Sequence, residues 1–314
     1  MALHVVLGKG PVGSTLADRL VDAGHDVRVL SRSGGRPSSR VEHVPLDASD
    51  AGALTAATRG AEVLYNCANP PYTRWAEQWP PVADALLCAA EATGAVLVVM
   101  GNLYGYGPVD GPMTEDLPLA APGTKGRVRV AMWQAALDRH RAGALRMTEA
   151  RASDFVGPRV VSTGHLGERA VPRLLAGRAV QHIASPDQPH SWTSVSDVAR
   201  TLEALGADER AWGRAWHVPT APPVTFREAV HGLCRAAGVP PVRVTSLPHV
   251  ALRAAGLFAP MLRELEETRY QFTRPYVLDS SAATKTFALT PTPLERTFAD
   301  TVAWWRGRAA VRSG

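Results

Sequence analysis

The sequence predicts an α/β protein built on a doubly wound parallel sheet, with a smaller C-terminal substrate lobe. Three observations predict it. Short apolar, β-branched segments alternate with longer helical patterns through residues 1–157, which is typical of strands buried on both faces. A glycine-rich turn follows the first apolar segment. The chain has 314 residues and is 46% hydrophobic, so it is long enough for a large domain and a second lobe.

The first part of the chain contains the regular alternation. Runs rich in valine and leucine predict strands, and apolar residues at helical spacing predict the crossovers between them. We expect strands over residues 3–7, 27–30, 41–44, 63–65, 96–100 and 145–150, and helices over residues 14–23, 51–58, 82–93 and 126–141.

The alternation weakens after Gly157-Pro158. We expect a strand end and helix over 195–205 with Ser196 or Asp197 near its cap, a last strand over 215–218, a helix from Thr225 to residue 237, a short strand over 242–244, a helix over 261–272 and a turn with a final helix over 291–305. Residues 1–157 are therefore predicted to form a dinucleotide-binding domain to which 191–218 return. Residues 158–190 and 219–314 are predicted to form mainly the substrate-binding lobe.

The turn after the first strand indicates what the chain binds. Gly8, Gly10 and Gly13 form G-x-G-x-x-G between a predicted strand and a predicted helix, the setting of the Rossmann dinucleotide-binding motif. Gly8 allows the tight turn, Gly10 lets the backbone approach a pyrophosphate, and Gly13 lets the helix pack closely on the strand. Pro11 is tolerated in the first helical turn, and the Val12 amide can face the anion.

The end of the second strand predicts which nicotinamide cofactor is preferred. Domains that prefer NAD usually place an acidic residue here, on the ribose 2′-hydroxyl. This chain has Arg32 and Ser33 instead. A guanidinium pairs well with a 2′-phosphate, so we expect NADPH/NADP+ to be the cofactor. The alternative is that Arg32 is a solvated loop arginine.

Composition excludes several other classes of function. The net charge of +5 and the pI near 9.4 come from scattered arginines rather than a basic block, so no nucleic-acid partner is expected. Cys67, Cys88 and Cys234 form no C-x-x-C pair, which fits a reducing cytoplasm. We see no metal-ligand spacing, no signal peptide and no apolar stretch of the roughly 20 residues that a membrane span needs. We therefore expect a cytoplasmic protein with no membrane partner and no metal, and the oligomeric state stays open.

Several later segments resemble, in order, those of the extended short-chain dehydrogenase/reductases, the group that includes sugar-nucleotide epimerases and dehydratases. The matching segments are Leu46-Asp47, Asn66-Cys67-Ala68-Asn69, Leu103-Tyr104-Gly105, Arg151 to Pro158 and Val195 to Ala199. The resemblance implies that Asp47 lies near the adenine and that Cys67 and Ala68 lie beside the cofactor ribose. It also implies that Ser153 and Phe155 lie near the nicotinamide.

The chain departs from this family at its catalytic triad. Met100 stands where the family holds a Ser or Thr, Lys125 where it holds the Tyr, and Arg129 where it holds the Lys. No tyrosine occurs between Tyr106 and Phe155 to replace the missing one. Gly101 and Asn102 stand where dehydratases hold an acidic pair. We therefore expect the usual triad to be absent.

Without that triad, hydride transfer to a carbonyl still needs a proton. Lys125, Tyr104 or Tyr106 could donate it, or the substrate could supply it from a phenol bonded to the ketone. The last route needs only positioning and hydride transfer from the enzyme. In this respect the chain resembles atypical ketoreductases of antibiotic tailoring pathways, which implies an NADPH-dependent ketoreductase acting on an aromatic polyketide or similar ketone.

Candidate substrate contacts follow from residue type and position, and each has a packing alternative. A loop rich in proline and aromatic residues follows the fourth strand, with Trp79 just beyond it, and suits an apolar ring system; its tryptophans serve equally well as structural caps. The candidates are Asn69, Tyr72, Trp75, Asn102, Tyr104 and His190, and His165 and Trp192 lie in the same predicted region. Two other functions remain open: a non-catalytic NADP-binding sensor or scaffold, and a sugar-nucleotide epimerase or dehydratase.

Overall fold

The chain divides into two units in a computed structural model that describes residues 1–35, 40–162, 164–247, 249–250 and 260–313. The first unit comprises Met1–Gly107, Pro118–Ala152 and Val198–Val218. The second comprises Pro108–Leu117, Ser153–Asp197 and Pro219–Gly314. Residues 108–117, 153–157 and 191–197 thus fall in the second unit, whereas the sequence grouped them with the first. The substrate-binding role of the second unit stays a prediction.

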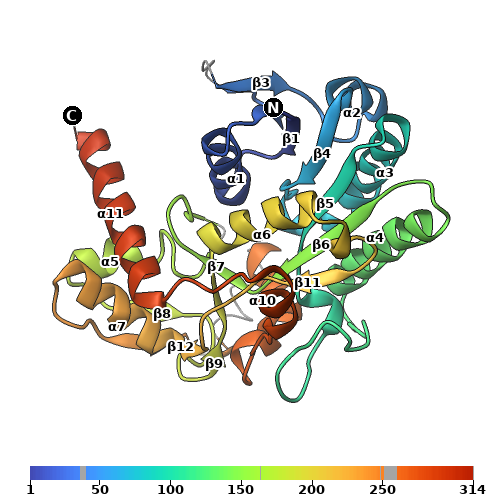
Figure 1. Ribbon diagram of the computed structural model, residues 1–314. Helices are drawn as coiled ribbons and strands as arrows, with labels where there is room; N and C mark the ends of the chain where they lie inside the picture. Colours follow the sequence, from blue (N-terminus) through green and yellow to red (C-terminus); the bar gives the residue numbers. More distant parts are fainter. Residues whose placement is uncertain (36–39, 163, 248, 251–259, 314) are drawn as a thin grey trace. The chain divides into compact units, whose positions relative to one another are not determined.

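A seven-stranded parallel sheet forms the centre of the first unit (Figure 1). Its strand order is β11-β6-β5-β4-β1-β2-β3. The strands are β1 (Leu3–Leu7), β2 (Asp26–Ser31), β3 (Val41–Pro45), β4 (Ala61–Asn66), β5 (Val96–Asn102), β6 (Met147–Ala152) and β11 (Ala215–His217). The order reverses between β1 and β4, whose carboxyl ends meet at the switch point where such sheets bind ligands. The predicted fold class is confirmed.

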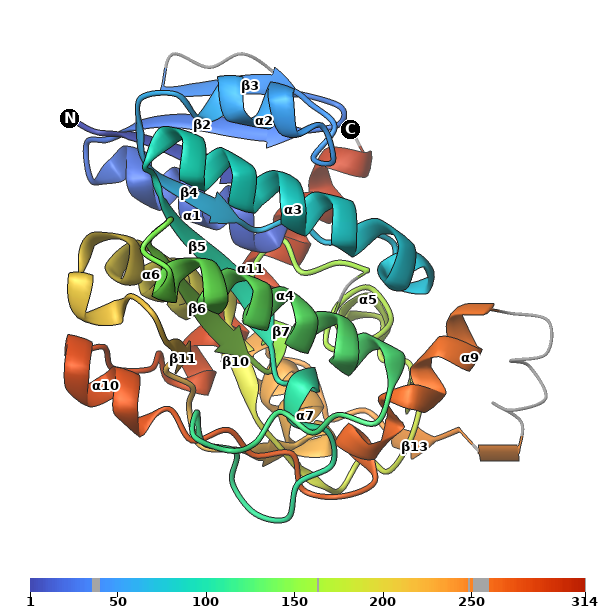
Figure 2. The same cartoon turned by 90° about the vertical axis from the view of Figure 1, so that its right-hand side faces the viewer.

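Helices cover both faces of this sheet. α2 (Ala51–Thr58), α3 (Trp75–Thr93) and α4 (Thr124–Arg141) lie side by side over one face (Figure 2). α1 (Pro11–Asp22) and α6 (Val195–Ala207) lie on the other, where Arg19 of α1 pairs with Glu203 of α6. The apolar strand residues are buried by both layers, which explains the near-continuous hydrophobic runs in the sequence.

Helix α3 begins at Trp75, earlier than the predicted start at residue 82. Pro80 and Pro81 lie inside it, and prolines disfavour a helix interior because they lack an amide hydrogen. Trp75 and Trp79 lie one helical turn apart and are 3% and 0% exposed. The burial of two indoles on one helix face favours the helical conformation and opposes the cost of the prolines.

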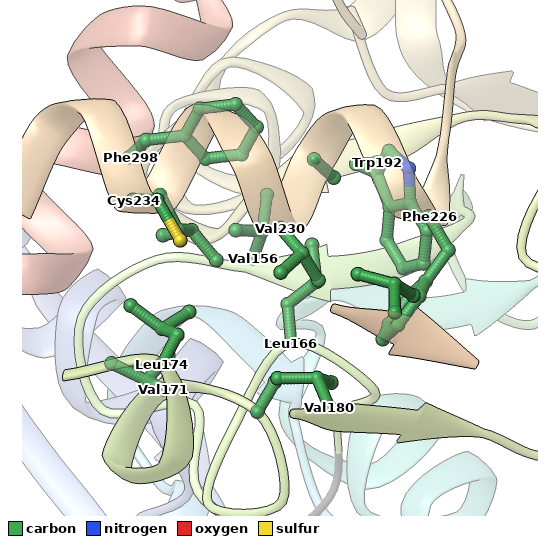
Figure 3. Close-up of a cluster of buried hydrophobic side chains, with 14 of the residues drawn as sticks. Val156, Leu166, Val171, Leu174, Val180, Trp192, Phe226, Val230, Cys234 and Phe298 are labelled. Carbon is green, nitrogen blue, oxygen red and sulfur yellow. The ribbon is translucent and has the colours of Figure 1, made fainter. Parts of the chain in front are cut away.

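The second unit contains short strand pairs and helices. β7 (Asp154–Val156) pairs with β10 (Trp192–Ser194), β8 (Val180–His182) with β13 (Val244–Ser246), and β9 (Pro189–His190) with β12 (Val224–Thr225). The helices are α5 (Val171–Leu175), α7 (Phe226–Ala237), α9 (Pro260–Glu267), α10 (Ser281–Phe287) and α11 (Leu294–Ser313). A buried apolar cluster that includes Val156, Trp192 and Phe226 forms the core of this unit (Figure 3).

Local signals place several elements of the second unit. Thr225 caps α7 through a reciprocal capping box with Glu228, as the predicted cap requires. Helix α6 begins at Val195, one residue before the predicted caps, and the Asp197 carboxylate accepts hydrogen bonds from the Thr292 amide and hydroxyl instead. The helix predicted over 261–272 ends at Glu267, and a 3₁₀ turn follows at Arg269–Phe272. Among the described residues, no helix is long and apolar enough to cross a membrane.

Candidate functional site

The three motif glycines differ in what surrounds them. Gly8 has φ +105°, and a Cβ there would lie 2.7 Å from the Cys67 carbonyl. A Cβ at Gly13 would lie 1.9 Å from the Gly8 carbonyl oxygen. A Cβ at Gly10 would meet no protein atom within 4 Å. Two glycines are therefore required by the turn itself, whereas Gly10 faces open space, as expected where a pyrophosphate approaches the backbone.

Helix α1 begins at this open side. Gly10 is its N-cap residue, with φ −70°, and no side chain caps the helix. The Gly10 carbonyl accepts the Ser14 amide at 2.9 Å, while the amides of the first turn, including Val12, have no partner within the helix. These amides and the positive end of the helix dipole favour an anion.

Two cations, Lys9 of the glycine turn and Arg32, lie at the loop that follows β2. The Lys9 amine donates to the Gly34 carbonyl at 2.7 Å, and the Ser31 hydroxyl donates to the same oxygen at 3.0 Å. This ties the loop after β2 to the glycine turn. Arg32 and Ser33 are exposed there. Sequence reasoning missed Lys9, although it stands inside the glycine motif.

Asp47 lies near this basic loop. Hydrogen bonds from the Ser49 amide and hydroxyl lower the pKa of its carboxyl, and the Arg32 charge lowers it further. Asp47 is therefore ionised at neutral pH, close to the cation predicted to select the 2′-phosphate. Its expected position near the adenine stays a prediction.

The segment after β4 packs under the glycine turn. The Cys67 amide donates to the Leu7 carbonyl at 2.8 Å, and the Ala68 amide donates to the Asn66 side chain at 3.2 Å. Burial raises the pKa of the Cys67 thiol to about 12, so this cysteine stays protonated and unreactive at neutral pH. Cys67 thus serves the tight packing against Gly8 and Gly13.

The three residues at the triad positions have different surroundings. Met100 is buried in β5. Lys125 is buried in the first turn of α4, with its ammonium 4.5 Å from the centre of the Tyr72 ring. The Arg129 guanidinium lies between the indoles of Trp75 and Trp79, 4.6 and 4.4 Å from their rings. Two of the three predicted triad positions therefore hold long cations, and Arg129 is held by cation–π contacts. The loss of the usual triad stays a prediction.

Arg129 stays positively charged although its guanidinium is buried. Desolvation lowers the pKa of this guanidinium to about 10, so it remains a cation at neutral pH. Its Nε and Nη1 atoms have no hydrogen-bond partner among the described residues. The two indole faces partly replace the solvation that these atoms lose.

Lys125 and Arg129 belong to an aromatic cluster formed by Tyr72, Trp75, Trp79 and Tyr104. The Tyr72 ring lies 5.2 Å from Trp75 and 6.5 Å from Tyr104, and Trp75 lies 5.9 Å from Tyr104. Trp75 is 3% exposed and donates to the Pro70 carbonyl at 3.1 Å, so it packs in the core of the first unit. Tyr72 and Tyr104 are half-buried.

Asn69 and Asn102 flank this cluster at the ends of two strands. Asn69 is exposed just after β4, and Asn102 is half-buried at the end of β5. The Asn102 side chain accepts the Tyr104 amide at 3.1 Å, which orients the turn that carries Tyr104. Substrate contact by these residues stays a prediction.

A buried polar network that the sequence did not indicate lies beside the sheet. Arg151 donates to the Glu149 carboxylate at 2.5 Å and to the Tyr106 hydroxyl at 2.8 Å. The same hydroxyl lies 2.8 Å from His217 Nε2. Tyr106 is therefore engaged in a buried network, and its role as a possible proton donor stays a prediction. No sequence signal could link it to His217, since these residues are far apart in the chain.

Three predicted residues lie in the second unit. The Ser153 amide donates to the Thr193 hydroxyl at 3.2 Å, and Phe155 is half-buried in β7. His190 is buried against Asp154 at 2.8 Å. The proposed proximity of Ser153 and Phe155 to a nicotinamide stays a prediction. Among the residues that the structure covers, no group of three or more His, Cys, Asp or Glu side chains could hold a metal ion.

Solved structures with the same fold include sugar-nucleotide enzymes. A dTDP-glucose 4,6-dehydratase from Bacillus anthracis in complex with NAD has a TM-score of 0.81 and 16% identity over 99% of this chain and 98% of its own. A UDP-glucose 4-epimerase from Thermotoga maritima with UDP-glucose has a TM-score of 0.81 and 18% identity over 98% and 99%. A dTDP-glucose 4,6-dehydratase double mutant from Streptomyces venezuelae with NAD has a TM-score of 0.80 and 21% identity over 99% and 98%.

Sequence comparison adds the family. No curated protein matches the chain. The model of the NAD dependent epimerase/dehydratase family matches residues 5–216. This match begins in β1, includes the glycine turn and reaches β11, so it spans the whole sheet of the first unit. The chain therefore belongs to the NAD dependent epimerase/dehydratase family.

Proposed function

We propose that this protein is an NADPH-dependent oxidoreductase that reduces a ketone of an aromatic polyketide or a similar secondary metabolite. One observation supports the choice of reaction: Lys125, at the position where the sequence predicts the family's catalytic tyrosine, is buried with its ammonium over the Tyr72 ring. Met100 and Arg129 fill the other two triad positions without the serine hydroxyl or the lysine amine. A substrate that supplies its own proton needs no proton donor from the protein, so such a site only has to bind it and position it for hydride transfer.

The cofactor proposal is supported by the glycine turn and the basic loop beside it. Open space at Gly10 suits a pyrophosphate, and Lys9 and Arg32 offer positive charge where a 2′-phosphate would lie. The nicotinamide would supply a hydride to the carbonyl carbon. The chain's own residues would bind and orient the cofactor.

The carbonyl oxygen must then receive a proton, so that hydride and proton together convert the ketone into an alcohol. A phenol hydrogen-bonded to the ketone can supply it, as proposed for atypical ketoreductases such as the angucyclinone ketoreductase of simocyclinone biosynthesis. The alternative donor within the aromatic cluster is Lys125, which the Tyr72 ring holds in place. Tyr72 and Tyr104 would provide apolar surface for a ring system.

A second candidate function is supported by the comparisons. The matched family is that of epimerases and dehydratases, and the similar solved structures include complexes with UDP-glucose and with NAD. A sugar-nucleotide substrate would require another residue to remove a hydroxyl proton, because the positions that usually do so hold Met100, Lys125 and Arg129. The third possibility is a sensor or scaffold that binds NADP and catalyses nothing.

The deciding experiment compares a phenolic aromatic ketone with its O-methyl ether, using NADPH oxidation as the readout. We expect the phenol to be reduced and the ether to react far more slowly. Equal rates would exclude proton donation by the substrate and direct attention to Lys125. Lys125→Ala should then lower turnover by about 10²–10⁴-fold, with Lys285→Ala as control because Lys285 is exposed on α10.

Sugar nucleotides separate the remaining possibilities. Conversion of dTDP-glucose or UDP-glucose, with no reduction of either ketone, would replace the ketoreductase proposal with the second candidate. Tight NADPH binding without turnover of any of these substrates would support the sensor.

A further inference from the structure

Four titratable side chains that the proposed reaction does not use converge in the second unit. Asp154 of β7, His165 of the following loop, His182 of β8 and His190 of β9 come from four separate segments. Phe272 contacts all three imidazole rings, at centroid distances of 4.4, 4.7 and 4.8 Å. Assembling ionisable groups in an apolar core is unfavourable unless they are paired, so the pairing within this histidine cluster decides what it can do.

The inner pair is Asp154 with His190. His190 Nε2 lies 2.8 Å from Asp154 Oδ2, and its Nδ1 lies 3.2 Å from the Gln271 carbonyl oxygen. The Gln271 carbonyl can only accept a hydrogen bond, so its contact with Nδ1 requires a hydrogen on that nitrogen. Hydrogen bonding from His190, together with the nearby His165, lowers the pKa of the Asp154 carboxyl despite its burial. The carboxylate form therefore prevails at neutral pH.

The outer pair is Asp154 with His165. His165 Nε2 lies 4.0 Å from Asp154 Oδ1, too far for a direct hydrogen bond. The side chains of His165 and Asp154 are 23% and 16% exposed, whereas that of His190 is 2% exposed. The buried pair thus holds one oxygen of the carboxylate, and the second oxygen faces the more accessible imidazole.

The 4.0 Å gap has the right size for one oxygen atom. An oxygen at about 2.8 Å from each of the two atoms would see them at an angle of about 90°. A hydroxyl can use both partners, because it donates its hydrogen to one and accepts a hydrogen through a lone pair from the other. A carbonyl oxygen lacks the hydrogen that the carboxylate needs, and an ether oxygen lacks it as well.

The charge state of the cluster fits a neutral hydroxyl. Burial lowers the pKa of His165, and burial with the nearby His165 lowers the pKa of His182 to about 3. Both imidazoles are therefore neutral at pH 7. His182 Nε2 is buried and has no hydrogen-bond partner among the described residues, while its Nδ1 lies 3.3 Å from the Ala184 carbonyl oxygen. His165 can then present a neutral N–H beside the carboxylate.

We propose that Asp154 Oδ1 and His165 Nε2 bind a ring hydroxyl of the substrate, which donates to the carboxylate and accepts from the imidazole. His190 is a positioning residue, because it holds the carboxylate and is itself inaccessible. The ring is a phenol or a sugar. This inference rests on the proposed function for the existence of a ring-bearing substrate, and it assigns a specificity site that lies entirely within the second unit.

The test uses two probe pairs that differ in one free hydroxyl group: 1-hydroxyanthraquinone against its O-methyl ether, and UDP-glucose against a deoxy analogue of UDP-glucose that lacks one ring hydroxyl. Binding is measured by calorimetry on the full chain, with and without NADP+. We expect one hydroxyl-bearing probe to bind more tightly than its partner. Asp154→Asn and His165→Phe should each lower the affinity for that probe by about 10-fold or more and leave the affinity for the other member of the pair unchanged. The pair that responds tells whether the ring is a phenol or a sugar.

The control is His249→Phe, which removes another histidine of the second unit that contacts a carboxylate, that of Glu266 at 2.9 Å. This variant should leave the affinity for both members of each probe pair unchanged. His190→Gln should keep the hydroxyl preference but shift the pH profile of probe binding, since the carboxylate loses a hydrogen-bond partner that lowers its pKa. The groups that face this carboxylate are His165, His182 and His190.

Two results would overturn the inference: binding of neither hydroxyl-bearing probe by the wild type, or equal weakening of both members of a pair in the Asp154 and His165 variants. Both results are measured in the absence of NADP+ as well as in its presence. Loss of NADP+ binding would instead contradict the proposed function and leave the hydroxyl preference to be judged on the probe titrations alone.

Discussion

Replacing His182 tests whether a neutral buried histidine weakens the fold at low pH. The pKa of His182 is lowered to about 3 from an ordinary value of 6.5, mainly by burial. Between these two pH values the unfolded chain binds a proton that the folded chain excludes, so the free energy of unfolding falls as the pH falls. From pH 7 to pH 5 this single group accounts for a loss of about 2 kcal/mol, at about 1.36 kcal/mol per pKa unit.

His182→Phe should remove that part of the pH dependence. The His182 ring stacks on Phe226 at 4.2 Å and meets Phe272 at 4.7 Å, so a phenyl group fits an aromatic surrounding and loses mainly the contact with Ala184. The lowered pKa of His165 likewise makes the free energy of unfolding fall as the pH falls. The pKa of Asp154 is lowered from an already acidic value, so that group titrates below this window. His4 of the first unit, with a pKa of about 4, acts in the same direction and remains in both proteins.

The assay is urea unfolding at pH 7, 6 and 5, with wild type and His182→Phe compared at each pH. We expect the stability of His182→Phe relative to wild type to rise by about 2 kcal/mol between pH 7 and pH 5. Parallel pH dependences of wild type and His182→Phe would refute the reasoning, because they would mean that His182 titrates alike in both states.

Three further predictions concern the first unit. Arg32→Ala should weaken NADPH binding by about 1.5–3 kcal/mol and leave NADH nearly unchanged, since only the 2′-phosphate loses a charged partner; equal affinity of the wild type for both cofactors in a fluorescence titration would contradict this. Gly10→Val should stay folded, because its φ of −70° suits any residue and nothing lies within 4 Å of the new Cβ, yet it should bind NADPH poorly, with exposed Gly307→Val as control; normal binding would place the cofactor elsewhere. Tyr106→Phe should lower the free energy of unfolding by about 1–3 kcal/mol, because Arg151 and His217 lose a shared hydroxyl; an unchanged melting temperature in calorimetry would show that the network contributes little.

The sequence by itself determined the parts of the protein that depend on neighbours in the chain. The alternation of strands and helices and the glycine turn can be read locally, because side-chain periodicity and backbone freedom are set by adjacent residues. The absence of the usual triad stays a prediction, which rests on residue identity at the spacings of the family's motifs. The Thr225 cap was equally readable, because its partner Glu228 is three residues away.

The tertiary structure decided what those residues contact. The sequence placed Lys125 and Arg129 at the triad positions, but only the packing of α3 against α4 places Arg129 between two indoles and Lys125 over Tyr72. The same packing favours a continuous α3 across Pro80 and Pro81, although the local helix propensity of proline disfavours it. The histidine cluster joins segments separated by up to 36 residues between Asp154 and His190, and no periodicity relates them. Contacts of this kind form because the core brings distant segments together, and the free energy of burial then selects the charge state of each group.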